Sequence, residues 1–301
     1  MKKISILITL CMAAGVFFFA GRCGIICDAG IDPQKIPVKT IEVDDIKIAY
    51  KEFGRGYPLI LIMGYSATMD VWDPAVLKDL SRRYRVIIFD NRGMGKTTTS
   101  DKEFTIELFA DDTAHFMQRI GVERSHVLGY SMGTSIAQEL ALKYPEKVNK
   151  LILYAADCGG GEAIPPSPEA MRQLTDTRDA PKERQERLIR LMLPEKWLKA
   201  NPDYHKRLPR VRETSPAANI DRQTRAMERW KGCYSRLPTI VQDTLLITGT
   251  DDVLTPPGNS LILVQRIPSS WLVRLDGGGH GVMYQRPKEF ARILLTFLET
   301  K

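Results

Sequence analysis

The segment Gly129-Tyr130-Ser131-Met132-Gly133 contains the side chain of this sequence that is best placed to act as a nucleophile. The apolar pair Val127-Leu128 precedes it, and a helical pattern over residues 132–144 follows it. In such a strand–turn–helix context, G-x-S-x-G forms a tight turn that exposes the serine Oγ, and the flanking glycines leave space for the turning backbone. We therefore predict that Ser131 is a catalytic nucleophile.

A serine hydroxyl reacts slowly near neutral pH, so it needs a base within reach and a carboxylate that orients this base. Of the four histidines, His280 lies in the glycine-rich segment 277–281, directly after the last predicted strand. Glycine there lets the ring approach a neighbouring strand end. The others fall in a helix, at the start of a strand and in an inserted segment, where structural roles suffice: His115, His126 and His205. His280 is the predicted base.

The orienting carboxylate is expected in residues 249–256, which follow the apolar run Leu245-Leu246-Ile247. Asp251 and Asp252 both lie in this segment. Asp157, which follows another strand, is a third candidate. Asp251 and Asp252 both satisfy the chain order Ser, Asp, His. The residues alone therefore leave the choice of the orienting carboxylate open.

The negative charge that develops on a carbonyl oxygen during acyl transfer requires hydrogen-bond donors held in place, usually two backbone N–H groups. One donor is expected from the residue after the nucleophile, Met132. The other is expected from the loop Met63-Gly64-Tyr65-Ser66, which follows an apolar run of strand length. Tyr65 is the candidate for this second donor.

Strand and helix patterns alternate from residue 33 onward, and their connections predict how these residues meet. The expected strands are a hairpin, 40–43 with 47–53, and then 59–63, 85–89, 125–129, 151–154, 244–248 and 271–275. The expected helices are 72–83, 105–120, 132–144, 257–266 and 287–298. Strands joined by crossover helices predict an α/β fold with a doubly wound, mostly parallel sheet.

The alternation stops over residues 158–238, where helical patterns appear at 182–193 and 221–230 without a strand. We therefore expect a core of residues 33–157 and 239–301 with a helical cap inserted at 158–238. The cap holds 17 Lys and Arg against 11 Asp and Glu, and so carries most of the net charge of +7. Because no arginine-rich run is interleaved with aromatic residues, nucleic-acid binding is not expected.

Residues 1–32 are expected to form a signal peptide or an N-terminal membrane anchor with a linker. Lys2-Lys3 precede an uncharged apolar run over residues 4–21. We therefore expect an exported protein that is secreted, held in the cell envelope or anchored in the membrane. Cys158 and Cys233 bracket the cap and could form a disulfide in an oxidising compartment, with two unpaired thiols as the equal alternative.

The segment Gly95-Lys96-Thr97 matches the end of a phosphate-binding loop, but Asp90 stands where that motif requires its first glycine. No Cys and His residues have zinc-binding spacing. We expect an enzyme without cofactor or metal.

Five segments together resemble the α/β-hydrolase superfamily, in its branch of cap-bearing serine hydrolases with haloperoxidase-like and lipoprotein-like relatives. They are Met63-Gly64-Tyr65, residues 90–95, residues 129–133, residues 249–256 and Gly279-His280-Gly281. The resemblance implies Ser131 as nucleophile, His280 as base, Asp252 as acid and the amides of Tyr65 and Met132 as oxyanion donors. Relatives commonly have His-Gly where this chain has Met63-Gly64, but a backbone donor survives that exchange.

The expected function is cofactor-independent hydrolysis of a small or medium carboxylic ester or lactone through an acyl-enzyme on Ser131. Amide or peptide cleavage, C–C bond hydrolysis and perhydrolysis on the same residues are the alternatives. A dehalogenase is disfavoured because its nucleophile is an aspartate. A hydrolase-like protein that binds a small molecule without turnover is the alternative from another class.

Overall fold

The computed structural model of the protein describes residues 32–300. The expected signal peptide or membrane anchor therefore lies outside the described residues, apart from the last position of its linker. In the described part of the chain, no helix combines the length and the apolar character needed to cross a membrane.

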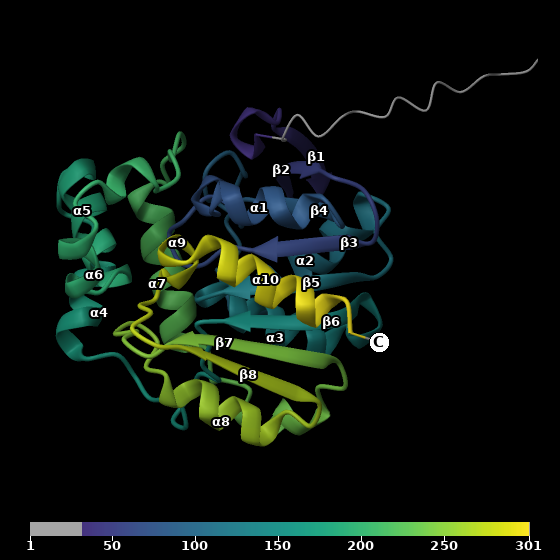
Figure 1. Ribbon diagram of the computed structural model, residues 1–301. Coiled ribbons are helices and arrows are strands. Elements are labelled where there is room, and N and C mark those ends of the chain that lie inside the picture. Colours follow the sequence, from purple (N-terminus) through teal and green to yellow (C-terminus); the bar gives the residue numbers. More distant parts are fainter. Residues whose placement is uncertain (1–31, 301) are drawn as a thin grey trace, which may run out of the picture. The chain divides into compact units, whose positions relative to one another are not determined.

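One sheet of eight strands forms the centre of the described structure (Figure 1). Its order is β1-β2-β4-β3-β5-β6-β7-β8. The first two pairings are antiparallel and all others are parallel, as the alternation of strands and helices predicts. The strands are β1 (Lys39–Val43), β2 (Ile46–Phe53), β3 (Pro58–Ile62), β4 (Arg85–Phe89), β5 (Ser125–Tyr130), β6 (Val148–Tyr154), β7 (Asp243–Gly249) and β8 (Ser270–Leu275).

Helices cover both faces of this sheet because the buried strands are apolar on both sides. Along β3, Ile60 and Ile62 belong to one core, whereas Leu59 and Leu61 belong to the other. The first core also contains residues of α2 (Ile106–Arg119), α3 (Met132–Lys143) and α8 (Gly258–Arg266). The second contains residues of α1 (Pro74–Ser81) and α10 (Pro287–Leu298). The predicted fold class, α/β with a mostly parallel doubly wound sheet, is confirmed.

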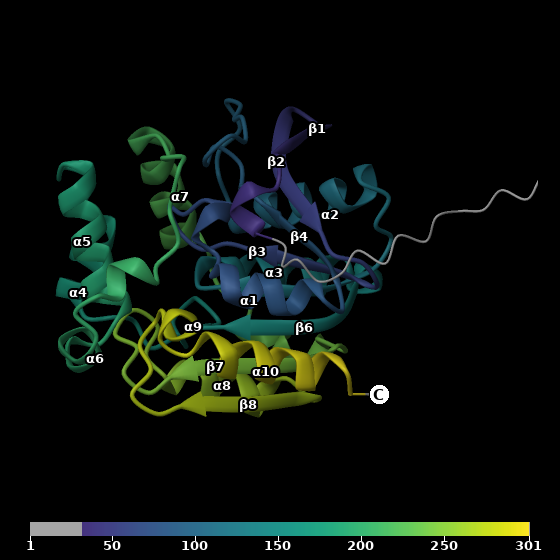
Figure 2. The same cartoon turned by 45° about the horizontal axis from the view of Figure 1, so that its top comes forward.

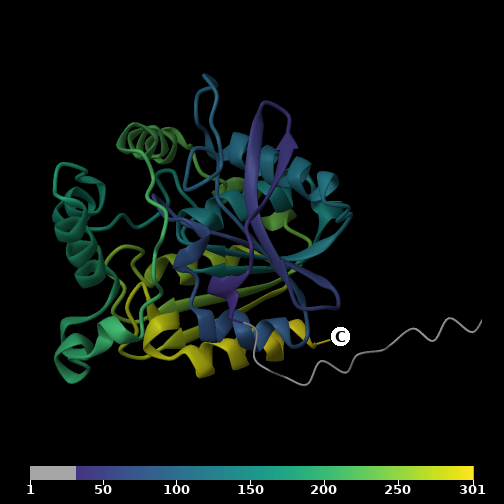
Figure 3. The same cartoon turned by 90° about the horizontal axis from the view of Figure 1, so that it is seen from above.

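The chain between β6 and β7 forms helices and no strand, as predicted for the inserted segment. The helices are α4 (Pro168–Thr175), α5 (Pro181–Met192), α6 (Glu195–Ala200) and α7 (Ala217–Arg229). They lie beyond the carboxyl ends of the parallel strands, toward which the arrowheads point (Figure 1, Figure 2 and Figure 3). Of the described helices, α4, α6 and α9 (Val282–Gln285) were not predicted.

The two cysteines at the ends of the insertion are free thiols. The Cys233 N–H donates to the Cys158 carbonyl at 2.8 Å, and the Cys233 thiol donates to the Gln138 side-chain oxygen at 3.2 Å. Burial raises the pKa of Cys158 to about 11. Of the two alternatives from the sequence, the structure therefore has unpaired thiols, and backbone hydrogen bonding joins the ends of the insertion.

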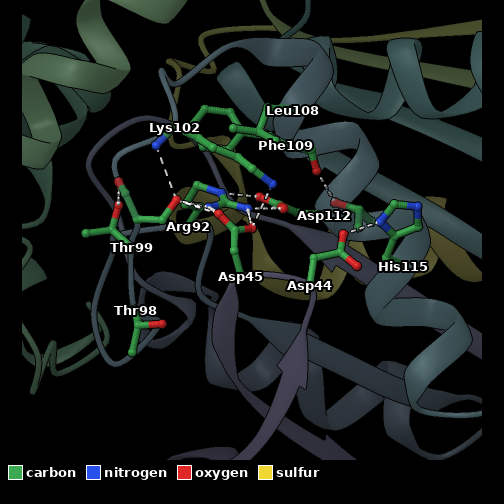
Figure 4. A network of polar contacts seen from close by, with 12 residues as sticks. Asp44, Asp45, Arg92, Thr98, Thr99, Lys102, Leu108, Phe109, Asp112 and His115 are labelled. Carbon is green, nitrogen blue, oxygen red and sulfur yellow. Dashed lines mark hydrogen bonds and ion pairs between the residues drawn. The ribbon is translucent and has the colours of Figure 1, made fainter.

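A buried arginine connects three segments that are distant in the sequence (Figure 4). Nε and Nη2 of Arg92, in the loop after β4, donate to the two carboxylate oxygens of Asp112 in α2 at 2.8 and 2.6 Å. Nη2 also donates to Asp45, in the turn between β1 and β2, at 2.9 Å. The Arg92 side chain is 0% exposed. This paired cation fixes the hairpin against the helix and against the loop that follows β4.

Candidate active site

Ser131 lies at the junction of β5 and α3 in a backbone conformation that is uncommon for a residue with a side chain. Its φ is 55° and its ψ is −125°. It occupies the N-cap position of α3, yet its hydroxyl makes no capping hydrogen bond. The Ser131 N–H donates to the Tyr154 carbonyl of β6 at 3.0 Å. Positive φ thus turns the side chain away from its usual capping role and leaves its Oγ available for chemistry.

The glycines of the turn are required by the close approach of backbone segments. A Cβ on Gly133 would lie 2.2 Å from the Ile62 carbonyl oxygen at the end of β3. A Cβ on Gly129 would lie 2.4 Å from the Gly133 carbonyl oxygen. The first turn of α3 therefore packs directly on the strand end, which brings its unpaired N–H groups next to Ser131.

His280 and Asp252 form a buried pair at the same edge of the sheet. The His280 Nδ1 lies 2.9 Å from Asp252 Oδ2 and 3.1 Å from Oδ1. The carboxylate is held in turn, since its Oδ1 accepts hydrogen bonds from the N–H groups of Leu254 and Thr255 at 2.9 and 2.8 Å. The side chains of His280 and Asp252 are 5% and 0% exposed. Both imidazole and carboxylate are therefore fixed in orientation.

The two other candidate carboxylates are engaged elsewhere. Asp251 is exposed and accepts from the Thr250 hydroxyl at 3.2 Å. Asp157 accepts from the Gly159 N–H at 2.8 Å, and burial raises its pKa. Of the three aspartates, only Asp252 makes a hydrogen bond or an ion pair with His280 among the described residues.

The loop that carries His280 is fixed by aromatic residues from the strands beside it. The His280 carbonyl oxygen accepts hydrogen bonds from the hydroxyls of Tyr154 and Tyr130, at 2.5 and 3.3 Å. The Tyr130 and His280 ring centroids are 5.1 Å apart. Because Tyr130 directly precedes Ser131, the imidazole of His280 lies beside the turn of Ser131. No hydrogen bond joins the Ser131 hydroxyl to the imidazole within the described structure; such bonds often tighten only when substrate is bound.

The loop after β3 is held against Ser131 from several sides. A Cβ on Gly64 would lie 3.0 Å from the Ser131 Cβ. The Asn91 side-chain amide donates to the Met63 carbonyl at 2.9 Å. From α7, the Gln223 side-chain oxygen accepts from the Ser66 N–H at 2.8 Å, while the Tyr65 and Thr224 hydroxyls are 2.7 Å apart. The loop is thereby held next to Ser131 at Gly64, the residue before the predicted oxyanion donor Tyr65.

These supporting residues escaped the sequence analysis. Tyr65 and Thr224 are 159 positions apart, and Tyr154 and His280 are 126 apart. No local spacing signals such pairs. Of the supporting residues, Tyr130 and Asn91 lie in segments that the sequence had singled out, 129–133 and 90–95, but their types alone do not indicate the contacts with His280 and Met63.

The segment that ends in Gly95-Lys96-Thr97 is a structural loop. The buried Asp90 carboxylate accepts from the N–H groups of Met69 and Lys96 at 2.7 and 3.0 Å, and burial raises its pKa to about 6. The Lys96 side chain pairs with Glu213 at 3.0 Å. Across residues 32–300, no group of three or more His, Cys, Asp or Glu side chains could hold a metal ion.

Two of the remaining histidines, His126 and His115, have structural contacts. His126 is buried against the rings of Tyr57 and Tyr84, and this burial lowers its pKa to about 4. The His115 Nδ1 lies 2.5 Å from Asp44 Oδ2, at the hairpin turn shown in Figure 4.

The model of the alpha/beta hydrolase fold family matches residues 57–287. The match covers β3 to β8, the turn of Ser131 and the Asp252–His280 pair, and the chain belongs to this family. It is a hydrolase of the α/β class.

Two curated relatives illustrate the range of activities associated with this class. The chain is 26% identical over 268 residues to the putative carbamate hydrolase RutD of Azorhizobium caulinodans, across 84% of this chain and 95% of that protein. It is 26% identical over 276 residues to the putative non-heme bromoperoxidase BpoC of Mycobacterium tuberculosis, across 84% and 97%.

Among solved structures, a thermophilic esterase from Thermogutta terrifontis has a TM-score of 0.75 to this chain. It is 24% identical and covers 87% of this chain and 98% of its own. At this identity the similarity supports the fold alone.

Proposed function

We propose that the protein is a serine hydrolase that cleaves a small or medium carboxylic ester or lactone without a cofactor. The observation that carries the proposal is the combination of Ser131 in its positive-φ turn with the buried His280–Asp252 pair at the same edge of the sheet. A hydroxyl excluded from helix capping and an oriented imidazole are the two parts that acyl transfer requires.

The orientation of His280 assigns the steps. Its Nδ1 faces Asp252, so Nε2 is the nitrogen that accepts the Ser131 proton as Oγ attacks the carbonyl carbon. Asp252 stabilises the imidazolium that forms. The N–H groups of Tyr65 and Met132 receive the oxyanion, and the returned proton releases the alcohol. Water activated by His280 then adds to the acyl-enzyme and releases the acid.

The names of the relatives favour two further reactions on the same residues. A carbamate joins the features of an ester and an amide, so cleavage of an amide-type bond is the second candidate. Perhydrolysis is the third, in view of the relative named as a bromoperoxidase.

We also propose that residues 158–238 act as a cap and that the protein is exported. The Met192 carbonyl at the end of α5 accepts the Gly281 N–H at 2.8 Å, and α7 holds the Tyr65 loop. The insertion thus contacts both sides of the site. Export rests on the residues of the N-terminus, and intact-mass analysis of the native protein would reveal whether they are removed.

Replacement of the nucleophile tests the proposal. Ser131→Ala should lower kcat on p-nitrophenyl esters by at least about 10³-fold and abolish labelling by a fluorophosphonate, with an unchanged circular dichroism spectrum. Ser135→Ala, one turn further along α3, is the matched control and should retain both. Ordinary esterase activity in Ser131→Ala would refute the assignment. Aminoacyl amides assayed beside the esters would separate the second candidate from the first.

A further inference from the structure

One face of α7 is fixed to the loop that follows β4. The Asn219 side-chain amide donates to the Gly93 carbonyl at 2.9 Å. Nη2 of Arg222 donates to the Ser100 carbonyl, also at 2.9 Å. Gln223 lies four positions after Asn219, so it shares this face of the helix. The helix is therefore held on the core by contacts that do not involve Gln223.

Gln223 is a polar residue on the buried side of α7. Ile220 and Ala226, three positions before and after it, belong to the first core, and Gln223 itself is 0% exposed. Its Oε1 accepts the Ser66 N–H at 2.8 Å, whereas its Nε2 has no hydrogen-bond partner within the described structure. A buried donor without a partner is costly, and an apolar side chain would remove that cost. The amide is therefore best explained by what its oxygen does for Ser66.

The backbone of Ser66 needs such a restraint. Its φ is 56°, a left-handed conformation that is unfavourable for a residue with a side chain. Conformations of this kind persist only where their surroundings enforce them. The hydrogen bond to Gln223 fixes the peptide that joins Tyr65 and Ser66.

The N–H of Tyr65, the proposed oxyanion donor, lies between two such restraints. Before it in the chain, the Met63 carbonyl accepts the side-chain amide of Asn91 at 2.9 Å. After it, the Ser66 N–H donates to Gln223. The first restraint belongs to the core and the second to the inserted segment. The direction of the Tyr65 N–H therefore depends on both.

We propose that Gln223 is a positioning residue for the oxyanion hole. Its side-chain oxygen holds Ser66 so that the Tyr65 N–H points to the place where the oxyanion develops. The proposal rests on the serine hydrolase function above and assigns part of the transition-state stabilisation to the inserted segment. Because the oxyanion forms only in the transition state, loss of this restraint lowers kcat and leaves KM nearly unchanged.

The test replaces Gln223 by methionine, which has a similar length and no amide. On p-nitrophenyl butyrate, Gln223→Met should lower kcat by about 10- to 100-fold, the range expected for a displaced oxyanion donor, with KM within about threefold of the wild type. The midpoint of urea unfolding should change little, because the variant loses one hydrogen bond and one unpaired buried donor together.

Arg222→Met is the matched control, because it removes hydrogen bonds between α7 and the core and keeps the contact of Gln223 with Ser66. Its kcat should stay within about threefold of the wild type. An unchanged kcat in Gln223→Met, or an equal loss in both variants, would overturn the proposal. A loss of activity that follows a lower midpoint of unfolding in Gln223→Met would also overturn it.

Amide hydrogen exchange separates this proposal from the hydrolase function, because it requires no turnover. The exchange rate of the Ser66 N–H is measured by NMR in Ser131→Ala and in Ser131→Ala with Gln223→Met. Exchange that is at least tenfold faster in the double variant supports the restraint on the loop. The same result in a protein whose wild type cleaves no ester refutes the hydrolase function alone. Equal exchange rates refute the positioning role and leave the nucleophile untouched.

Discussion

The two carboxylate oxygens of Asp252 have different partners. Oδ1 accepts the N–H groups of Leu254 and Thr255, while Oδ2 faces the His280 Nδ1 at 2.9 Å. An asparagine would keep its oxygen toward the two N–H groups and would therefore turn its NH₂ toward Nδ1. The imidazole would then have to carry its proton on Nε2, where it could not accept a proton from Ser131.

At the residue scale we therefore predict that Asp252→Asn lowers kcat by about 10³- to 10⁴-fold with little loss of stability. Steady-state assay on a p-nitrophenyl ester and urea unfolding would measure the two effects. Asp251→Asn is the matched control. Its exposed side chain accepts from the Thr250 hydroxyl and makes no contact with His280 among residues 32–300, so kcat should stay within about twofold. A larger loss in Asp157→Asn than in Asp252→Asn would reassign the acid.

At the scale of elements, the contact between α3 and β3 depends on the absence of a side chain at Gly133. The Ile62 carbonyl oxygen lies 2.2 Å from the point where a Cβ on Gly133 would stand. The Ile62 carbonyl and Gly133 both belong to the backbone. A shift that relieved this contact would therefore move the strand end or the first turn of α3, and Ser131 with that turn.

We predict that Gly133→Ala lowers the free energy of unfolding by about 1–3 kcal/mol, the typical cost of overpacking. It should also lower kcat, since the nucleophile moves with the helix. Gly161→Ala is the control, because apart from its two chain neighbours no heavy atom of the described structure lies within 4 Å of its Cβ position. The stability of this variant should change by less than about 0.5 kcal/mol. Wild-type stability and turnover in Gly133→Ala would contradict this account of the turn. Urea unfolding and initial rates measure both.

At the scale of the whole molecule, Arg92 joins the hairpin turn, the loop after β4 and α2 (Figure 4). Burial raises the pKa of Asp112 even though Arg92 donates to it, so the carboxylate is costly to bury without the cation. Loss of one partner is therefore worse than loss of both.

We predict that Arg92→Met destabilises the fold by about 3–5 kcal/mol, the usual effect of leaving a buried charge unpaired. The double variant with Asp112→Leu should recover part of that loss. Arg172→Met, which breaks the exposed pair with Glu169, should destabilise the fold far less than Arg92→Met. Chemical unfolding monitored by fluorescence compares the three. Equal losses in Arg92→Met and Arg172→Met would exclude a structural role for the buried network.

Much of the fold could be predicted from local patterns. The strand Arg85–Phe89 and the helix Pro287–Leu298 have the bounds that the sequence predicts, because continuous apolar runs and proline at a helix start act over a few residues. The prediction of Ser131 as nucleophile rests on the same kind of local information, since the turn that exposes it is built from its immediate neighbours.

What the sequence by itself determined is therefore the strands, most of the longer helices and the identity of the residues with reactive groups. The tertiary structure decided which of them meet. It placed Asp252 rather than Asp251 or Asp157 against His280. This outcome depends on contacts between segments that are far apart in the chain. Such contacts are set by the packing of the whole sheet and its helices, so the local spacing of residues cannot predict them.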